Sequence, residues 1–193
     1  MTRPAALLPP AKPAVSPLRR LLLGLFAVSC AGAGGLFAWQ RWSATSSAED
    51  DRRLLDLFLD RAWEDAEGRP LYTASLRGQV LLINFWATWC PPCVEEMPEL
   101  DQLQKEWGGR GAQVLGIGID SRAKILDFSR RARFTYPLLV GGAEGSDLSR
   151  AFGNVSAALP FTVLIGRDGR VRERILGRFN LSHLREALRA AAR

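Results

Sequence analysis

The spacing of hydrophobic residues changes at one point, near residue 90. Val80–Trp86 is a nearly continuous apolar run rich in β-branched and aromatic residues, which is typical of a strand buried on both faces of a sheet. Beyond it, apolar residues recur every three or four positions, which predicts a helix with one face on that sheet. These residues are Val94, Met97, Leu100, Leu103 and Trp107. Cys90 and Cys93 lie at the junction between the two patterns.

The rest of the carboxyl-terminal pattern predicts further strands and helices. We expect strands over residues 114–120, 136–140, 161–165 and 171–176, and helices over 121–133, 146–152 and 181–192. Ser121 and Asn180 are suitable helix caps, and the glycine-rich stretch 141–145 predicts a flexible loop. Residues 54–72 are weakly patterned, and Glu67–Pro70 predicts a turn between two short strands.

The amino-terminal residues have a different composition. Residues 1–18 contain five prolines and little to bury, which predicts a disordered cytoplasmic tail. Within 19–42, the stretch from Leu21 to Trp39 carries no formal charge, and its length just spans a hydrocarbon core of about 30 Å. Four of the five basic residues in 1–49 precede this stretch and one follows it closely, so the positive-inside rule places the following domain outside the cytoplasm. We therefore predict a transmembrane anchor or uncleaved signal at 19–42, a linker at 43–53 and a folded domain at 54–193.

Two alternatives to the anchor also export the domain. A cleaved signal peptide would use the small residues Ala31-Gly32-Ala33. A lipoprotein signal would make Cys30 a lipidated amino terminus. The apolar run continues past Cys30 to Trp39, which favours the anchor over both.

The net charge of +6 raises the question of nucleic-acid binding. Residues 1–49 contain five basic residues and one acidic residue, whereas residues 50–193 contain 21 basic and 19 acidic residues. A nucleic-acid-binding domain would carry a basic face of its own. The nearly neutral domain therefore argues against a nucleic-acid partner.

The position of Cys90 favours thiol chemistry. The first N–H groups of a helix lack partners and carry a partial positive charge, which stabilises a thiolate. In Cys-x-x-Cys pairs at helix starts the thiol pKa falls from about 8.5 to roughly 3.5–7.5. Pro91 and Pro92 suit the first helical turn, and Pro91 also pushes Cys90 into an extended conformation. We expect Cys90 to lie outside the helix with an exposed sulfur, and Cys93 to be its shielded partner.

Metal binding is the competing interpretation of the pair. A structural zinc site needs four ligands, but the chain offers three cysteines and one histidine, and neither Cys30 nor His183 belongs to the same segment as the pair. Copper(I) could use two thiolates and the thioether of Met97. Redox exchange between Cys90 and Cys93 is the favoured interpretation, with no metal and no other cofactor.

The stretch NFWATWCPPC at 84–93, followed by EEMP at 95–98 and ALPFTVLIGRDGRV at 158–171, resembles the TlpA/ResA-like thiol–disulfide oxidoreductases. The resemblance covers about residues 54–193. It implies a thioredoxin-like α/β sandwich with a central mixed sheet flanked by helices, on one amino-terminal transmembrane helix. It also implies a redox-active disulfide between Cys90 and Cys93, a cis peptide bond before Pro160, and a reducing role.

The same resemblance directs attention to Glu96. Thioredoxins usually carry a buried aspartate six residues before the first cysteine, where this chain has Asn84, and the TlpA/ResA-like branch places a glutamate three residues after the second cysteine. Residues i and i+3 share a helix face. We therefore expect Glu96 to be partly buried, to have a raised pKa, and to exchange a proton with Cys93. Alternatively, Glu95, Glu96 and Glu99 simply favour a helix amino end.

These observations predict an exported protein-disulfide reductase. Its substrates would be exported proteins such as apocytochrome c or copper-site proteins, and the resemblance implies that a membrane electron-donor thiol transporter would reduce it again. The catalytic residues would be Cys90, Cys93 and Glu96, and the resemblance implies that Leu159 presents its backbone to a substrate peptide. The substrate-binding surface around the sulfur would be formed by Trp86, Trp89, Pro91, Pro92, Leu159 and Pro160. A copper chaperone using Cys90, Cys93 and Met97 is the alternative, and an oxidase would use the same residues as the reductase.

Overall fold

The computed structural model describes residues 49–193, which form a compact unit. The predicted tail and anchor, and the alternatives at Cys30, lie outside the described residues. No helix in the part described is long and apolar enough to cross a membrane.

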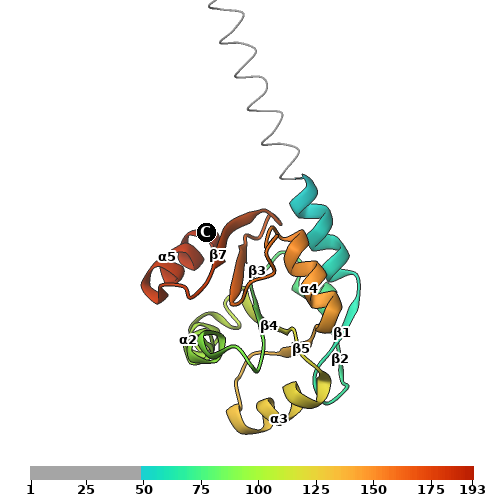
Figure 1. Ribbon diagram of the computed structural model, residues 1–193. Helices are drawn as coiled ribbons and strands as arrows, with labels where there is room; N and C mark the ends of the chain where they lie inside the picture. The colour runs from blue at the N-terminus through green and yellow to red at the C-terminus, as the bar shows by residue number, and fades with distance from the viewer. Residues whose placement is uncertain (1–48) are drawn as a thin grey trace, which may run out of the picture. The chain divides into compact units, whose positions relative to one another are not determined.

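A five-stranded mixed sheet in the order β5-β4-β3-β6-β7 forms the centre of this unit (Figure 1). The strand β3 (Val80–Trp86) lies in the middle, and all seven of its residues are buried. It pairs in parallel with β4 (Ala112–Gly118) and antiparallel with β6 (Phe161–Ile165). The outer strands are β5 (Leu138–Val140) and β7 (Val171–Leu176). The continuous apolar pattern of β3 therefore reflects its central position.

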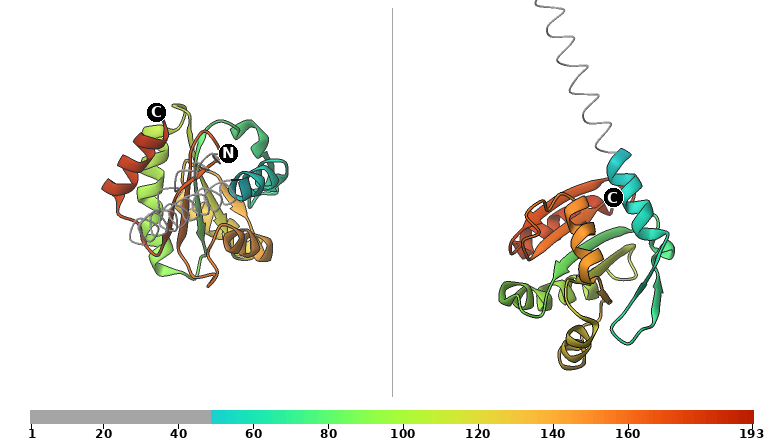
Figure 2. Two further views of the ribbon diagram at one scale, coloured as in Figure 1. Left: turned by 90° about the horizontal axis from the view of Figure 1, so that it is seen from above. Right: turned by 45° about the vertical axis from the view of Figure 1, so that its right-hand side comes forward.

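Helices cover both faces of the sheet (Figure 2). On one face α2 (Pro91–Trp107) and α5 (Leu181–Ala191) pack over a core cluster that includes Leu82 of β3 and Ile125 of α3 (Arg122–Ala132). A helix over residues 49–59 and α4 (Gly142–Ala151) lie on the other face, over a cluster that contains Phe58, Phe85 and Phe152. This confirms the predicted mixed sheet between layers of helices.

The short hairpin near the amino end of this unit also matches its prediction. The strand β1 (Ala62–Glu64) pairs antiparallel with β2 (Pro70–Tyr72) around the predicted turn, and the 3-10 helix η1 (Thr73–Leu76) follows. The Thr73 hydroxyl is buried and donates to the carbonyl oxygen of Phe58 at 3.0 Å. The start of η1, directly after the hairpin, is thereby held to the helix over 49–59.

Two local predictions were wrong. Residues 49–53 were assigned to the linker, but they belong to the helix over 49–59. The glycine-rich stretch was assigned to a loop, but α4 begins at Gly142. A Cβ atom added at Gly141 or Gly145 would lie 2.6 or 2.9 Å from Cγ2 of Ile117. These glycines therefore let the start of α4 pack closely on β4.

Candidate active site

The start of α2 holds a disulfide between Cys90 and Cys93, with their Cα atoms 5.3 Å apart. Cys90 is the N-cap residue in an extended conformation, and Pro91 and Pro92 occupy the first turn, as predicted. The Cys90 carbonyl oxygen accepts the first helical hydrogen bonds, from the N–H groups of Cys93 at 3.1 Å and Val94 at 3.2 Å. The first half of the pair thus precedes the helix and the second lies within it.

The prediction of an exposed Cys90 sulfur was wrong for this oxidised state. Cys90 is only 4 % exposed and Cys93 is 0 % exposed. The disulfide ties Cys90 to the first turn of α2, and its side chain packs in the cluster that contains Trp86 and Met97. The predicted order of the two cysteines nevertheless holds, because the remaining exposure is on Cys90.

The two tryptophans before Cys90 have opposite environments. Trp89 is 63 % exposed, so it can contribute to the surface beside the disulfide as predicted. Trp86 is fully buried, and its ring centroid lies 4.9 Å from that of Phe128, so its assignment to that surface was wrong. The reason is that Trp86 still belongs to the central strand β3 and points into the core, whereas Trp89 lies in the loop after it.

The prolines of the predicted surface also differ in exposure. Pro91 is exposed and Pro92 is partly buried. The Leu159–Pro160 peptide bond is cis, as the resemblance implied, with Leu159 partly buried and Pro160 buried. The carbonyl oxygen of Pro160 accepts a hydrogen bond from the N–H of Gly177 at 2.8 Å. Pro160 is therefore a fixed support of the loop before β6, and its ring is not a surface group.

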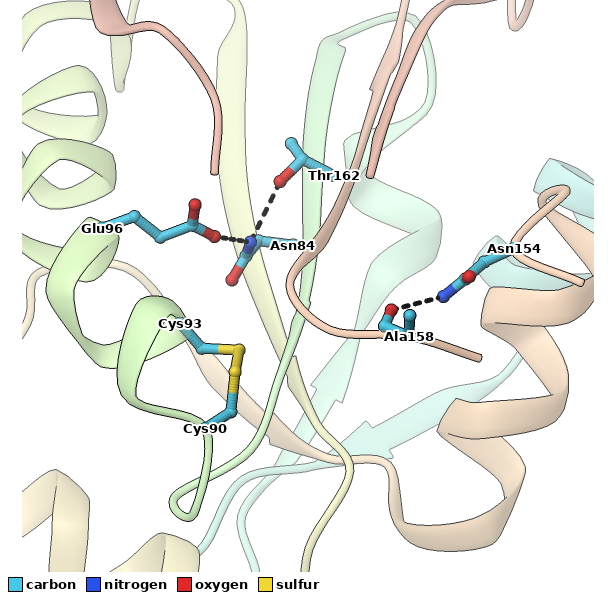
Figure 3. Close-up of a disulfide and its surroundings, with 7 residues drawn as sticks. All are labelled: Asn84, Cys90, Cys93, Glu96, Asn154, Ala158 and Thr162. Atoms are coloured by element: carbon cyan, nitrogen blue, oxygen red, sulfur yellow. Dashed lines mark hydrogen bonds between the residues drawn. A yellow bond between two sulfur atoms is a disulfide. The ribbon is translucent and has the colours of Figure 1, made fainter. Parts of the chain in front are cut away.

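Glu96 is fully buried in a small polar cluster on the α2 side of the sheet (Figure 3). The Asn84 side-chain amide nitrogen donates to Oε1 of Glu96 at 2.7 Å and to the Thr162 hydroxyl at 3.0 Å. Register explains the grouping, because Asn84 lies opposite Thr162 in the antiparallel pair of β3 and β6. The second Glu96 oxygen, Oε2, forms no hydrogen bond within residues 49–193.

The enclosure of Glu96 changes its acidity. Burial raises the pKa of the Glu96 carboxyl from 4.5 to about 7, and the hydrogen bond from Asn84 opposes this only in part. Glu96 lies one turn after Cys93 on the same face of α2, whereas Glu95 is exposed and pairs with Arg178 at 3.1 Å. A carboxyl group with this pKa can both accept and release a proton near neutral pH.

Sequence reasoning missed a contact that holds the loop before Cys90. The Thr88 hydroxyl hydrogen-bonds to the carboxylate of Asp120, which follows β4. Although burial opposes ionisation, hydrogen bonds from Thr88 and from the N–H of Ser121 hold the pKa of Asp120 below its usual value. Because β3 and β4 are parallel, the loops that follow them leave the sheet at the same edge. The expectation of two neighbouring parallel strands could therefore have predicted that Thr88 and Asp120 lie close together.

The copper alternative depends on the redox state of the pair. Met97 is buried one turn after Cys93. Both sulfurs that copper would need are bonded to each other in the disulfide, so this alternative stays a prediction. His183 lies apart from the pair and contacts Glu173 at 3.0 Å.

Comparison with known proteins relates this chain to thiol–disulfide oxidoreductases. A model of the AhpC/TSA family matches residues 55–174. The thiol-disulfide oxidoreductase ResA of Geobacillus thermodenitrificans is 28% identical over 130 residues, covering 67% of this chain and 72% of that protein. ResA of Bacillus thuringiensis subsp. konkukian is 27% identical over 126 residues, covering 65% of this chain and 70% of its own length.

A solved structure supports the same relationship. A thiol:disulfide interchange protein of the thioredoxin family from Chlorobium tepidum TLS matches with a TM-score of 0.61 and 28% identity, over 69% of this chain and 93% of that one. The expected thioredoxin-like α/β fold is confirmed, with the Cys90–Cys93 pair at the amino end of its α2 helix.

Proposed function

This chain belongs to the AhpC/TSA family and is a thiol–disulfide oxidoreductase of the ResA type, and we propose that it works as a reductase of cysteine pairs in exported proteins. The observation that carries the proposal is the arrangement around Cys90. The more accessible cysteine caps α2 from outside, its partner is enclosed within the first turn, and a buried acid lies behind the partner.

In the proposed reaction, two electrons pass from the reduced pair to the substrate disulfide. The Cys90 thiolate, stabilised by the start of α2, attacks one substrate sulfur and releases the other as a thiolate. The Cys93 thiolate then attacks the Cys90 sulfur and displaces the second substrate sulfur. The products are a substrate dithiol and the Cys90–Cys93 disulfide, the bond present in this structure.

We assign the proton step to Glu96. Cys93 must lose its proton before it attacks, and its side chain is already enclosed in the disulfide form, where it is 0 % exposed. An ionised Glu96 carboxylate can take that proton, because its pKa near 7 lies close to that of an ordinary thiol. On reduction of the disulfide the same group returns a proton to Cys93.

The cellular context belongs to the same proposal. The apolar segment at 19–42 would anchor the chain in the cytoplasmic membrane, with the catalytic domain on the outer face. Apocytochrome c and copper-site proteins, which carry cysteine pairs, are suitable substrates. A membrane thiol transporter would reduce Cys90–Cys93 after each turnover. The direction of electron flow depends on the reduction potential, where about 30 mV corresponds to 1.4 kcal/mol, and measuring that potential separates a reductase from an oxidase.

A trapping variant tests the nucleophile and identifies the substrate. Cys93→Ser removes the resolving thiol, so we expect a mixed disulfide to accumulate on Cys90 in cells and to be visible as a thiol-sensitive complex on non-reducing gels. The Cys90→Ser, Cys93→Ser double variant is the control, because it keeps Cys30. Complexes that persist in the double variant, or none in the single variant, would contradict the proposed mechanism.

A further inference from the structure

The loop between α4 and β6 is held by a buried amide that the mechanism above does not use. Asn154 is 3 % exposed, and its Nδ2 atom donates to the carbonyl oxygen of Ala158 at 2.8 Å and to the hydroxyl of Ser149 at 2.9 Å. Its backbone N–H donates to the Ser149 carbonyl oxygen at 3.1 Å. Figure 3 shows Asn154 at the end of α4, across the loop from the disulfide. One side chain thus connects the carboxyl end of α4 to the residues before Pro160.

The contact with Ala158 also orients the next N–H group. The Ala158 carbonyl and the Leu159 N–H belong to one planar trans peptide unit and point in opposite directions. When Asn154 fixes the carbonyl on the α4 side, the Leu159 N–H must point away from α4. Within residues 49–193, neither the N–H nor the C=O of Leu159 takes part in a backbone hydrogen bond.

The loop needs such a restraint. Ala157 has a φ of 51°, a left-handed conformation that residues other than glycine seldom adopt, and its N–H donates to the Asn154 carbonyl oxygen at 2.9 Å. On the far side, the Pro160 carbonyl is paired with Gly177. Leu159 is therefore held from both sides while its own backbone groups stay free for a partner strand.

We infer that Asn154 is a positioning residue, which aims the unpaired Leu159 N–H at the backbone of a peptide that carries the substrate disulfide. This inference rests on the proposed function and adds a determinant of substrate class to it. A substrate with an extended peptide around its disulfide can pair with the oriented Leu159 backbone and should react faster for that reason. A small disulfide without a peptide backbone cannot form this pairing.

The test compares two substrates in three variants. Asn154→Ala removes the side-chain donor, and Asn154→Asp keeps its shape but cannot donate to the Ala158 carbonyl. Asn180→Ala is the matched control, because Asn180 caps α5 with a hydrogen bond from the His183 N–H and lies outside this loop. Reduced protein of each kind is mixed with a disulfide-containing peptide or with hydroxyethyl disulfide, and the two second-order rate constants are measured.

We expect the ratio of the peptide rate to the hydroxyethyl disulfide rate to fall at least about fivefold in both Asn154 variants, as loss of one positioning hydrogen bond implies, and to stay constant in Asn180→Ala. An unchanged ratio in a folded Asn154 variant, or an equal fall in the control, would overturn the inference and leave the redox function intact. If the unmodified protein reacted with neither disulfide, the proposed function would fail, and this inference with it.

Discussion

Glu96 is a carboxyl group enclosed by protein, and the side-chain hydrogen bond that it accepts comes from an uncharged amide, Asn84. The acid therefore binds its proton more tightly in the folded chain than in the unfolded one. A group of this kind stabilises the fold below its unfolded pKa of 4.5, and that stability is lost as the pH rises through about 7. The carboxyls whose pKa is lowered behave oppositely, and they lose their contribution only on acidification below about pH 4. They are Asp101, Glu106, Asp120 and Asp168.

Replacing Glu96 by glutamine should remove a pH dependence of stability. We expect the oxidised protein to lose on the order of 3 kcal/mol between pH 5 and pH 8, and Glu96→Gln to lose much less. Urea unfolding at the two pH values measures the difference, and Glu95→Gln, on the exposed face, is the matched control. The proton role further requires that Glu96→Gln change the pH profile of disulfide exchange, so an unaltered profile would contradict it.

Substitutions of Trp86 and Trp89 should have different effects, the first on the stability of the fold and the second on the reaction with substrate. Trp86→Ala empties a site in the core next to Phe128 and should cost about 3–5 kcal/mol of unfolding free energy. Trp89→Ala removes an exposed ring and should change stability by no more than about 0.5 kcal/mol. Its effect should instead be a slower reaction with protein disulfides. Equal losses of stability in the two variants would contradict this assignment.

Among the elements, the helix over 49–59 shows why the domain begins earlier than its hydrophobic pattern indicates. Its first residues are polar, but Asp51 pairs with Arg174 of β7, and Arg52 donates to the carbonyl oxygen of Asp168 at 3.1 Å. Arg174 also donates to the Phe152 carbonyl at 2.8 Å. The polar start of this helix is therefore tied by hydrogen bonds to β7 and to the turn before β7. Such contacts do not appear in the hydrophobic pattern of the sequence.

A truncation tests the role of this helix start. A chain that begins at residue 54 keeps only the six residues 54–59 of the helix, less than two turns, and such short helices are marginal on their own. We expect it to unfold with about 1–3 kcal/mol less free energy than a chain that begins at residue 46. Asp51→Ala in the longer chain measures how much of this free-energy difference comes from the ion pair between Asp51 and Arg174. Equal stability of the two chains would show that residues 49–53 contribute nothing to the stability of the domain.

At the scale of the whole molecule, we expect the fold to be independent of its disulfide. The bond joins residues three positions apart, so in the chain-entropy model it contributes only about 2 kcal/mol. The two core clusters, one on each face of the sheet, draw on residues from the whole unit. Both redox states can therefore share one architecture, as repeated turnover requires.

Reduction should accordingly leave the protein folded. We expect the reduced protein to keep its near-ultraviolet circular dichroism and to lose about 2 kcal/mol or less of its unfolding free energy. Hydrogen exchange should increase mainly around residues 87–97. A cooperative loss of structure on addition of dithiothreitol would show instead that the disulfide supports the core.

The sequence by itself determined the features that depend on neighbouring residues. The period of apolar residues placed β3 and α2, and the proline pair placed Cys90 outside the helix and Cys93 inside it. The spacing of three positions placed Glu96 on the face of Cys93. Each of these follows from backbone geometry within one or two turns of chain.

Only the tertiary structure decided features that join distant parts of the chain. Strand register brought Thr162 beside Asn84, and the depth of β3 in the sheet separated buried Trp86 from exposed Trp89. The contact of Asn154 with Ala158 depends on how α4 ends beside the loop before β6. A side chain's burial and its hydrogen-bond partners are set by what packs against it, and residues far apart in the chain supply that packing.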